Sequence, residues 1–138
     1  MTHTFVPLLL KSTDPRLLFI TSGTSTLTET EDQKIFLNKV PAKGWPKQGF
    51  SIPAYRSSKT GMNMMMREWE RILREDGVKV WCISPGYLAT GLGGSQEANK
   101  QRGAGDPAVG GSFIRDVVEG KRDQDVGKAI RNGGIQPW

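Results

Sequence analysis

The chain has 138 residues, a formal net charge of +5 and a hydrophobic content of 36%. This length predicts one domain, residues 1–138, that is large enough to bury a core. The single cysteine, Cys82, excludes an internal disulfide and indicates a reducing, cytoplasmic compartment. No apolar window has the length of a membrane span, and no arginine-rich or aromatic-interleaved basic run is present, so we expect neither membrane nor nucleic-acid partners.

The first third of the chain predicts a helix end, a strand and a long loop. Residues 3–11 are largely apolar and lead into a break at Asp14 and Pro15, as helix ends do. Residues 17–21 (LLFIT) form a continuous apolar run, the pattern of a parallel strand buried on both faces. Residues 24–53 are polar and rich in proline and glycine, which predicts a long loop.

A helix is expected next, over the stretch AYRSSKTGMNMMMREWERIL (54–73), which is rich in helix formers and is followed by Gly77. Its apolar side chains share one stripe on a helical wheel: Met62, Met66, Trp69 and Leu73, with Met65 and Ile72 beside them. Tyr55 and Lys59 continue this stripe toward the helix start. On its own, such a pair indicates a lysine that reaches solvent from a helix end more often than a reactive pair.

Residues 78–84 (VKVWCIS) predict a second strand, which Pro85 and Gly86 end. A strand, a helix and a strand in this order predict two parallel strands in an α/β fold. After the glycine-rich residues 91–105, Asp106 and Pro107 predict the start of another helix. The apolar stripe of that helix is Phe113, Ile114, Val117 and Val118. The chain closes with a charged segment and with GGIQPW, which predicts a short last strand.

Three chemically suggestive segments converge at one edge of this predicted sheet. Open parallel sheets bind ligands beyond the carboxyl ends of their strands. Ser22 follows the first strand, Pro85 and Gly86 follow the second, and the helix start with Tyr55 and Lys59 lies between them in sequence. Y-x-x-x-K alone is a weak signal. A strand ending in TSG, then Y-x-x-x-K, then a strand followed by P-G-x-x-x-T is a much more specific pattern.

This ordered set, ITSG (20–23), AYRSSK (54–59) and SPGYLATG (84–91), resembles the C-terminal half of a short-chain dehydrogenase/reductase over essentially the whole chain. The resemblance implies a partial Rossmann-like, doubly wound parallel sheet and an NAD(P)-dependent interconversion of a ketone and a secondary alcohol. It implies Ser22, Tyr55 and Lys59 as the catalytic residues, with Ser25 a poorer candidate because it lies a turn further along the loop. The implied cofactor contacts are Tyr55, Lys59, Pro85, Gly86, Leu88 and Thr90.

The residue types suit this chemistry. Reduction of a ketone by hydride leaves an alkoxide that needs a proton, and a neighbouring ammonium group favours the phenolate form of a tyrosine. Lys59 would therefore support Tyr55 as the acid–base group and reach the ribose hydroxyls of the cofactor. Ser22 would donate a hydrogen bond to the substrate oxygen. A metal site is not expected, because His3 is the only histidine and no other ligands cluster around it.

The sequence departs from the family pattern in two ways. The spacing of 33 residues between Ser22 and Tyr55 is longer than in most members and comparable to carbonyl-reductase-like members, so residues 24–53 would line the substrate entrance. The family's glycine-rich cofactor motif, the residue that selects NAD or NADP, and the asparagine of the catalytic tetrad belong to an N-terminal half that the resemblance places before Met1. Residues 103–108 (GAGDPA) fit G-x-G-x-x-A on paper, but they follow no strand and Pro107 interrupts them.

We therefore expect little or no activity from the isolated chain. The first strand would leave an open apolar edge, so the sequence is a fragment of a longer product, a gene remnant, or a chain covered by a partner such as a second copy. The resemblance places a dimer interface on the Tyr55–Leu73 helix, where Met64 lies opposite the apolar stripe beside Gly61, although one exposed methionine needs no explanation.

The alternative function is a non-catalytic interaction module. The stretch GWPKQGFSIPAYRSSKTGMNMMM and the tail GIQPW resemble family members from filamentous fungi, which often serve secondary metabolism.

Overall fold

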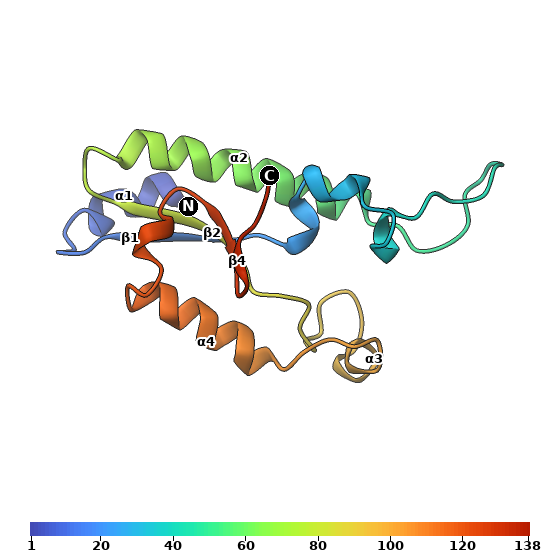
Figure 1. Ribbon diagram of the computed structural model, residues 1–138. Helices are drawn as coiled ribbons and strands as arrows, with labels where there is room; N and C mark the ends of the chain where they lie inside the picture. The colour runs from blue at the N-terminus through green and yellow to red at the C-terminus, as the bar shows by residue number, and fades with distance from the viewer.

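Four strands form one sheet in the order β1-β2-β3-β4 in the computed structural model, which describes residues 1–138. The strands β1 (Arg16–Ile20), β2 (Lys79–Ser84) and β3 (Ala129–Arg131) are parallel, and β4 (Gly134–Ile135) is antiparallel to β3. Helices α1 (Thr2–Leu9) and α2 (Pro53–Leu73) cover one face of the sheet, and α4 (Pro107–Val118) covers the other (Figure 1). The predicted α/β fold with a partial doubly wound sheet is confirmed.

The second strand is the centre of the core. Its side chains alternate between the two faces of the sheet, as strand geometry requires. Val80 and Cys82 pack with Met66 of α2, whereas Trp81 and Ile83 pack with residues of α4. All four strand side chains are fully buried. The continuous apolar run in this segment is therefore explained by helices on both faces.

The first strand is only partly buried, so the expectation of a strand buried on both faces is wrong for β1. Leu17, Leu18 and Phe19 are half-buried, and Ile20 is 40% exposed. Both faces of β1 contact apolar side chains, but β1 is an edge strand, paired with β2 alone. The open apolar edge that the sequence predicts is present in the structure.

The stripe of α2 that contacts the sheet differs from the predicted one along one side. Met66 and Leu73 are buried as expected, but Met65 is 43% exposed and Ile72 is 51% exposed. Asn63 and Glu70 are buried in their place. Polar side chains lie there at little cost because each has partners; the Glu70 carboxylate, for example, accepts from Arg74 Nε at 2.8 Å. On α4, Val118 is likewise exposed rather than packed.

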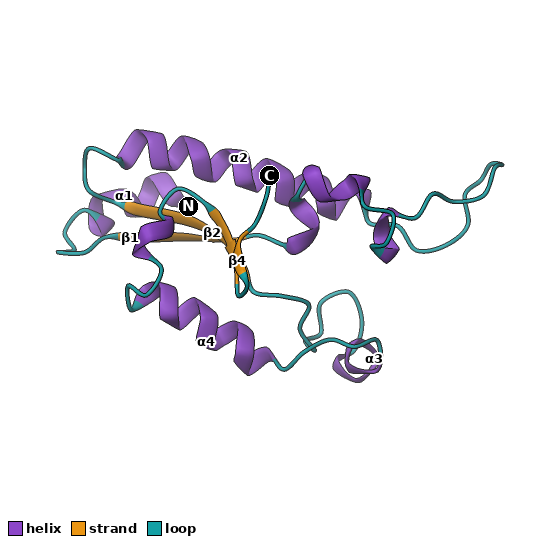
Figure 2. Cartoon of the chain, viewed as in Figure 1, coloured by secondary structure: helices purple, strands orange, loops and turns teal.

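The expected long loop is present, although its last predicted residue, Pro53, begins α2. It contains three short 3₁₀ helices, the first of which starts one residue before it: η1 (Gly23–Ser25), η2 (Thr28–Glu31) and η3 (Phe36–Asn38). Beyond η3 the loop extends away from the rest of the molecule as an arm, residues 39–52, and returns to the start of α2 (Figure 2). The Arg56 guanidinium ties the loop to α2 by donating to Thr24 O at 3.2 Å and Asn38 Oδ1 at 3.0 Å. No helix has the length and apolar character needed to span a bilayer.

Two further elements were not predicted from the sequence: the short helix α3 (Gln96–Gln101) and the strand β3. Between α4 and β3 lies η4 (Asp123–Asp125), whose first residue joins a cluster of four charges at the amino ends of β1 and β2. In this cluster Arg16 Nη1 lies 2.6 Å from Asp123 Oδ1, and Lys79 Nζ lies 2.6 Å from Asp123 Oδ2. Asp14 pairs with the same two cations, at 2.6 Å and 2.8 Å.

We expect the free energy of unfolding to fall as the pH drops from about 4 toward 2. Hydrogen bonds from Arg16, then from Lys79, lower the pKa of Asp123 to about 2, whereas an aspartate in an unfolded chain titrates near ~3.9. A depressed folded pKa contributes stability above the unfolded value, and this stability is lost as the pH falls toward the folded value. Urea unfolding midpoints between pH 2 and 7 should show a weaker acid dependence for Asp123→Asn. Asp76→Asn, on an exposed turn, is the control, and equal pH dependence in both variants would contradict the expectation.

Candidate active site

The three predicted catalytic residues lie where the carboxyl end of β1 meets the start of α2. Lys59 Nζ donates a hydrogen bond to the carbonyl oxygen of Ile20, the last residue of β1, at 2.8 Å. The same ammonium group lies 5.8 Å from the centre of the Tyr55 ring. Ser22 follows β1 by two residues and caps η1, with its Oγ accepting from Thr24 N at 3.2 Å. The inward line of Tyr55 and Lys59 on α2 therefore leads to the rim of the sheet.

The structure distinguishes Ser22 from Ser25. Ser22, like Tyr55 and Lys59, is half-buried, so a bound molecule can reach it. Ser25 is 1% exposed. Its Oγ donates to Ser22 O at 2.7 Å and accepts from Asn63 Nδ2 at 2.9 Å. A hydroxyl group that is buried and engaged in this way has no free access to a bound molecule, so Ser22 is the accessible serine of the two.

The other residues predicted to contact a cofactor, Pro85, Gly86, Leu88 and Thr90, follow β2 on the same rim. Thr21 N donates to Ile83 O at 2.8 Å, which brings the segments after β1 and β2 side by side. Gly86 has a φ of 105°, in the region that favours glycine, so the chain turns there after Pro85. Leu88 is half-buried and forms an isolated bridge with Gly105.

Thr90 is exposed at the end of this segment, and Asn99 holds its backbone. Asn99 is 3% exposed and donates from Nδ2 to Thr90 O at 2.8 Å and to Leu92 O at 3.0 Å. Its Oδ1 accepts from Tyr87 Oη at 3.1 Å. The position of Thr90 therefore depends on a buried amide in α3 that sequence reasoning missed.

The G-x-G-x-x-A stretch at 103–108 does not form a phosphate cradle. The backbone of Gly105 is hydrogen-bonded to the segment after β2 and has no free N–H for a phosphate. Its N–H donates to Tyr87 O and its carbonyl accepts from Ala89 N, each at 2.8 Å. At the following helix start, the Asp106 carboxylate accepts from Ala108 N at 2.8 Å. A carboxylate stands where a phosphate would bind the N-terminus of α4, and the two negative groups would repel each other.

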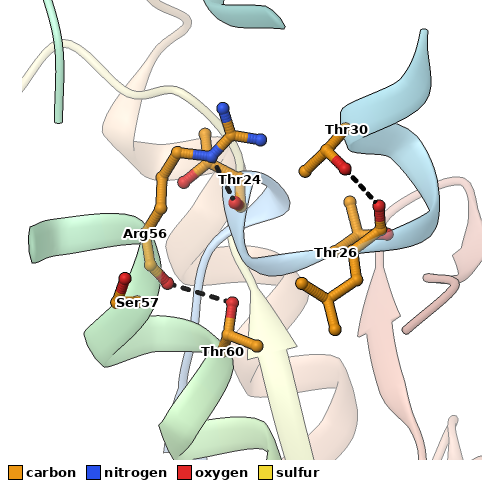
Figure 3. Close-up of a pocket in the computed structure, with 7 residues that line it drawn as sticks. Thr24, Thr26, Thr30, Arg56, Ser57 and Thr60 are labelled. Carbon is orange, nitrogen blue, oxygen red and sulfur yellow. Dashed lines mark hydrogen bonds between the residues drawn. The ribbon is translucent and has the colours of Figure 1, made fainter. Parts of the chain in front are cut away.

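An open pocket of about 280 Å³ lies between the start of α2 and the loop that follows β1 (Figure 3). It is lined by Thr24, Thr26, Leu27, Thr30, Arg56, Ser57 and Thr60. Arg56 and Thr60 already bond the backbone around it, the latter donating to Ser25 O at 2.8 Å. Neither Tyr55 nor Lys59 lines this pocket, so we place the candidate site at Ser22, Tyr55 and Lys59 instead. The structure has no group of three or more histidine, cysteine or acidic side chains placed to hold a metal ion.

Close packing of α4 against the segment after β2 supports a prediction about two adjacent glycines. A Cβ at Gly110 would collide with Leu88 Cδ1 and lie 3.3 Å from the Pro85 carbonyl oxygen, whereas a Cβ at Gly111 meets nothing within 4 Å. Gly111→Ala should raise the free energy of unfolding by about 0.5–1 kcal/mol, because alanine favours a helix interior. Gly110→Ala should lower it by about 1–3 kcal/mol through overpacking. Urea unfolding measures both, and equal effects would contradict the packing described.

Two buried amides near the site, Asn63 and Gln136, were also missed. Asn63 carried a usable signal, because it lies four residues after Lys59 and three before Met66 on the inward stripe. A polar side chain at a buried helical position requires hydrogen-bond partners, which points to a nearby polar loop. Gln136 carried no such signal, since nothing in its local sequence places it beside Ser22.

Comparison with known proteins gives a consistent result. The short chain dehydrogenase family profile matches residues 44–101. The chain is 51% identical to the short-chain dehydrogenase/reductase tropE of Talaromyces stipitatus, with 100% of this chain and 53% of that protein aligned. It is 49% identical to the short-chain dehydrogenase/reductase eupG of a Phoma species, over 99% of this chain and 52% of that protein. The chain thus spans about half the length of the curated relatives it matches.

Solved structures show the same fold at low sequence identity. The NADPH-bound carbonyl reductase from chicken fatty liver superposes with a TM-score of 0.73, over 99% of this chain and 51% of that chain, at 19% identity. The carbonyl reductase Sniffer of Drosophila melanogaster superposes with a TM-score of 0.65 over 99% of this chain and 51% of that chain, at 16% identity. The arrangement of helices and strands around the candidate site is therefore that of one half of a Rossmann-type domain.

Proposed function

The chain belongs to the short-chain dehydrogenase/reductase family, and we propose that it supplies the catalytic half of an NAD(P)-dependent oxidoreductase that interconverts a ketone and a secondary alcohol. One observation carries the proposal: the hydrogen bond of 2.8 Å from Lys59 Nζ to Ile20 O, which joins the helix start bearing Tyr55 to the strand end that precedes Ser22. This contact gathers a phenol, an ammonium group and an accessible hydroxyl at one rim of the sheet.

Each of these groups has a role in the proposed reduction. The nicotinamide, when bound, supplies hydride to the carbonyl carbon. The Tyr55 hydroxyl gives its proton to the carbonyl oxygen, and the Lys59 ammonium group stabilises the phenolate that remains. Ser22 Oγ donates a hydrogen bond to the same oxygen as negative charge develops on it. In the oxidation direction the proton moves from the alcohol to Tyr55.

The residues of the chain fit one end of the cofactor. The turn at Gly86, the exposed Thr90 and the half-buried Leu88 line the rim beside Tyr55 and Lys59, where the nicotinamide and its ribose would bind. The stretch at 103–108 does not suit a pyrophosphate, because Asp106 occupies the helix start there. We therefore assign the pyrophosphate to residues outside 1–138, and expect little or no turnover from residues 1–138 alone.

A chimera tests this proposal: residues 1–138 joined to the N-terminal half of the 51% identical Talaromyces relative. We expect the chimera to oxidise NADPH in the presence of a ketone from a panel of aromatic and aliphatic ketones. Ser22→Ala should lower its kcat by about 100-fold, because it removes one donor to the developing oxyanion. Ser57→Ala removes a hydroxyl from another side of the same helix turn and should leave kcat unchanged. Equal kcat values for the two variants would refute the role of Ser22.

The alternative function, an interaction module without catalysis, draws on the outer face of α2. Met64 is 61% exposed there, and Met65 and Ile72 are exposed as well. On this alternative, residues 1–138 form a stable complex with a second copy or with a full-length relative in the absence of NADPH. Light scattering on the isolated chain and on the mixture distinguishes the two functions. A monomeric chain in both samples removes the alternative.

A further inference from the structure

A buried polar cluster lies directly behind Ser22. Its members are each at most 5% exposed, come from four different parts of the chain, and bond one another through their side chains. They are Thr21, Ser25, Asn63, Ser84 and Gln136. No buried side-chain polar atom in the structure lacks a partner. Fully satisfied networks of this kind hold their neighbours in one arrangement.

Gln136 connects the two strand ends through this cluster. Its Nε2 donates to the Ser22 carbonyl oxygen at 3.2 Å and to Ser25 Oγ at 3.1 Å. Its Oε1 accepts from Ser84 Oγ, at the end of β2, at 2.6 Å. The backbone N–H of Gln136 donates to Ala129 O at 2.8 Å, which anchors the residue to β3. Both polar atoms of the side chain are therefore engaged, and the side chain is 1% exposed.

The Ser22 carbonyl oxygen accepts two more hydrogen bonds, from Ser25 Oγ at 2.7 Å and from Ser25 N at 3.0 Å. Ser25 is held in turn by Asn63 Nδ2 at 2.9 Å, and Asn63 Oδ1 accepts from Thr21 Oγ1 at 2.7 Å. Three donors on one carbonyl, of which only Gln136 comes from another part of the chain, fix the peptide plane after Ser22. The direction of the Ser22 side chain follows from that plane and from its bond with Thr24 N.

We propose that Gln136 is a positioning residue for the reaction: by holding the Ser22 carbonyl against the end of β2, it directs Ser22 Oγ toward the substrate oxygen. This inference rests on the proposed function of Ser22. A displacement of about 1 Å in a group that contacts the reacting atoms lowers a rate by about 10²-fold. The loss of Gln136 would also leave the buried Ser84 hydroxyl without its partner and remove one of the hydrogen bonds to Ser25 Oγ, which loosens the loop that carries Ser22.

A double-mutant cycle in the chimera separates positioning from a general effect on structure. Gln136→Met keeps the length of the side chain and removes its hydrogen bonds. We expect it to lower kcat by about 10- to 100-fold and to leave KM for NADPH within a factor of two. In the Ser22→Ala background the same substitution should lower kcat no further, because Gln136 acts through Ser22.

Thr28→Val is the matched control. Thr28 Oγ1 donates to the Trp138 carbonyl oxygen at 2.7 Å, so this variant weakens the same tail without touching Ser22. We expect it to keep the kcat of the parent. Should Gln136→Met fail to fold, Ser84→Ala makes the same test, because it frees the far end of the Gln136 amide. It should lower kcat in the parent and not in the Ser22→Ala background.

The outcomes are distinct. Losses of equal size for Gln136→Met in both backgrounds, or no loss in either, overturn the positioning role while leaving the function of Ser22 intact. A loss confined to the background that retains Ser22 supports it. Parent-like kcat in Ser22→Ala itself overturns the proposed function, and the inference about Gln136 with it.

Discussion

Replacing Tyr55 with phenylalanine is expected to lower kcat of the chimera by about 10²–10⁴-fold, the range that general acid–base catalysis contributes. The substitution removes only the phenolic oxygen, which would give the proton to the substrate. The ring remains, so its packing and its position near Lys59 Nζ, 5.8 Å from the ring centre, are preserved. Ketone-dependent NADPH oxidation measures the effect.

Two measurements keep this expectation specific. Calorimetric titration of NADPH into Tyr55→Phe should give a Kd within a few-fold of the parent, which shows that the variant is folded and binds cofactor. The Ser57→Ala variant, which changes a side chain between Tyr55 and Lys59 on another side of the same helix turn, should turn over like the parent. A Tyr55→Phe variant that binds NADPH and keeps kcat within three-fold of the parent would remove Tyr55 from the mechanism.

Replacing Trp81 with alanine is expected to lower the free energy of unfolding by about 3–5 kcal/mol, as loss of a buried large aromatic side chain does. Trp81 is fully buried on β2 and packs with Phe113 and Val117 of α4. Its indole N–H donates to Arg122 O at 3.2 Å, and the Arg16 guanidinium lies 5.6 Å from the ring centre. The substitution therefore removes apolar burial, a hydrogen bond and a cation–π contact together.

Trp45→Ala is the matched control for this change. Trp45 is 87% exposed in the arm of residues 39–52, so its removal should change the free energy of unfolding by no more than about 0.5 kcal/mol. Urea unfolding of the two chimera variants gives both values. Similar unfolding free energies for Trp81→Ala and Trp45→Ala would contradict the position of Trp81 at the centre of the core.

The elements predicted from the sequence are those whose signal is local. Three elements can each be predicted from their own residues, and the structure confirms them. They are β2 by its apolar run, α2 by its helical spacing and α4 by its Asp106–Pro107 start. β3 has only three residues, flanked by Lys128 and ending at Arg131, and its strand character comes from pairing with Cys82 of β2. Because this pairing joins segments that are far apart in sequence, no local pattern predicts the strand.

The candidate site also has one part that the sequence predicts and one part that it does not. That Ser22, Tyr55 and Lys59 meet at one rim follows from parallel strands and from the position of α2 between them, and the sequence alone carries both facts. The polar cluster behind Ser22 depends on the return of the chain terminus to the end of β1. Gln136 lies 114 positions from Ser22, and its environment exists only in the folded molecule.

The most direct test of the proposed function compares ketone-dependent NADPH oxidation by the chimera with that by residues 1–138 alone, after circular dichroism has shown both to be folded. We expect turnover by the chimera and none by the isolated chain, because residues 1–138 carry the proposed acid–base groups, whereas the stretch at 103–108 does not suit a pyrophosphate. Turnover by residues 1–138 at the rate of the chimera would show that the cofactor needs no other half. A folded, NADPH-binding chimera that reduces no ketone in the panel would contradict the catalytic assignment itself.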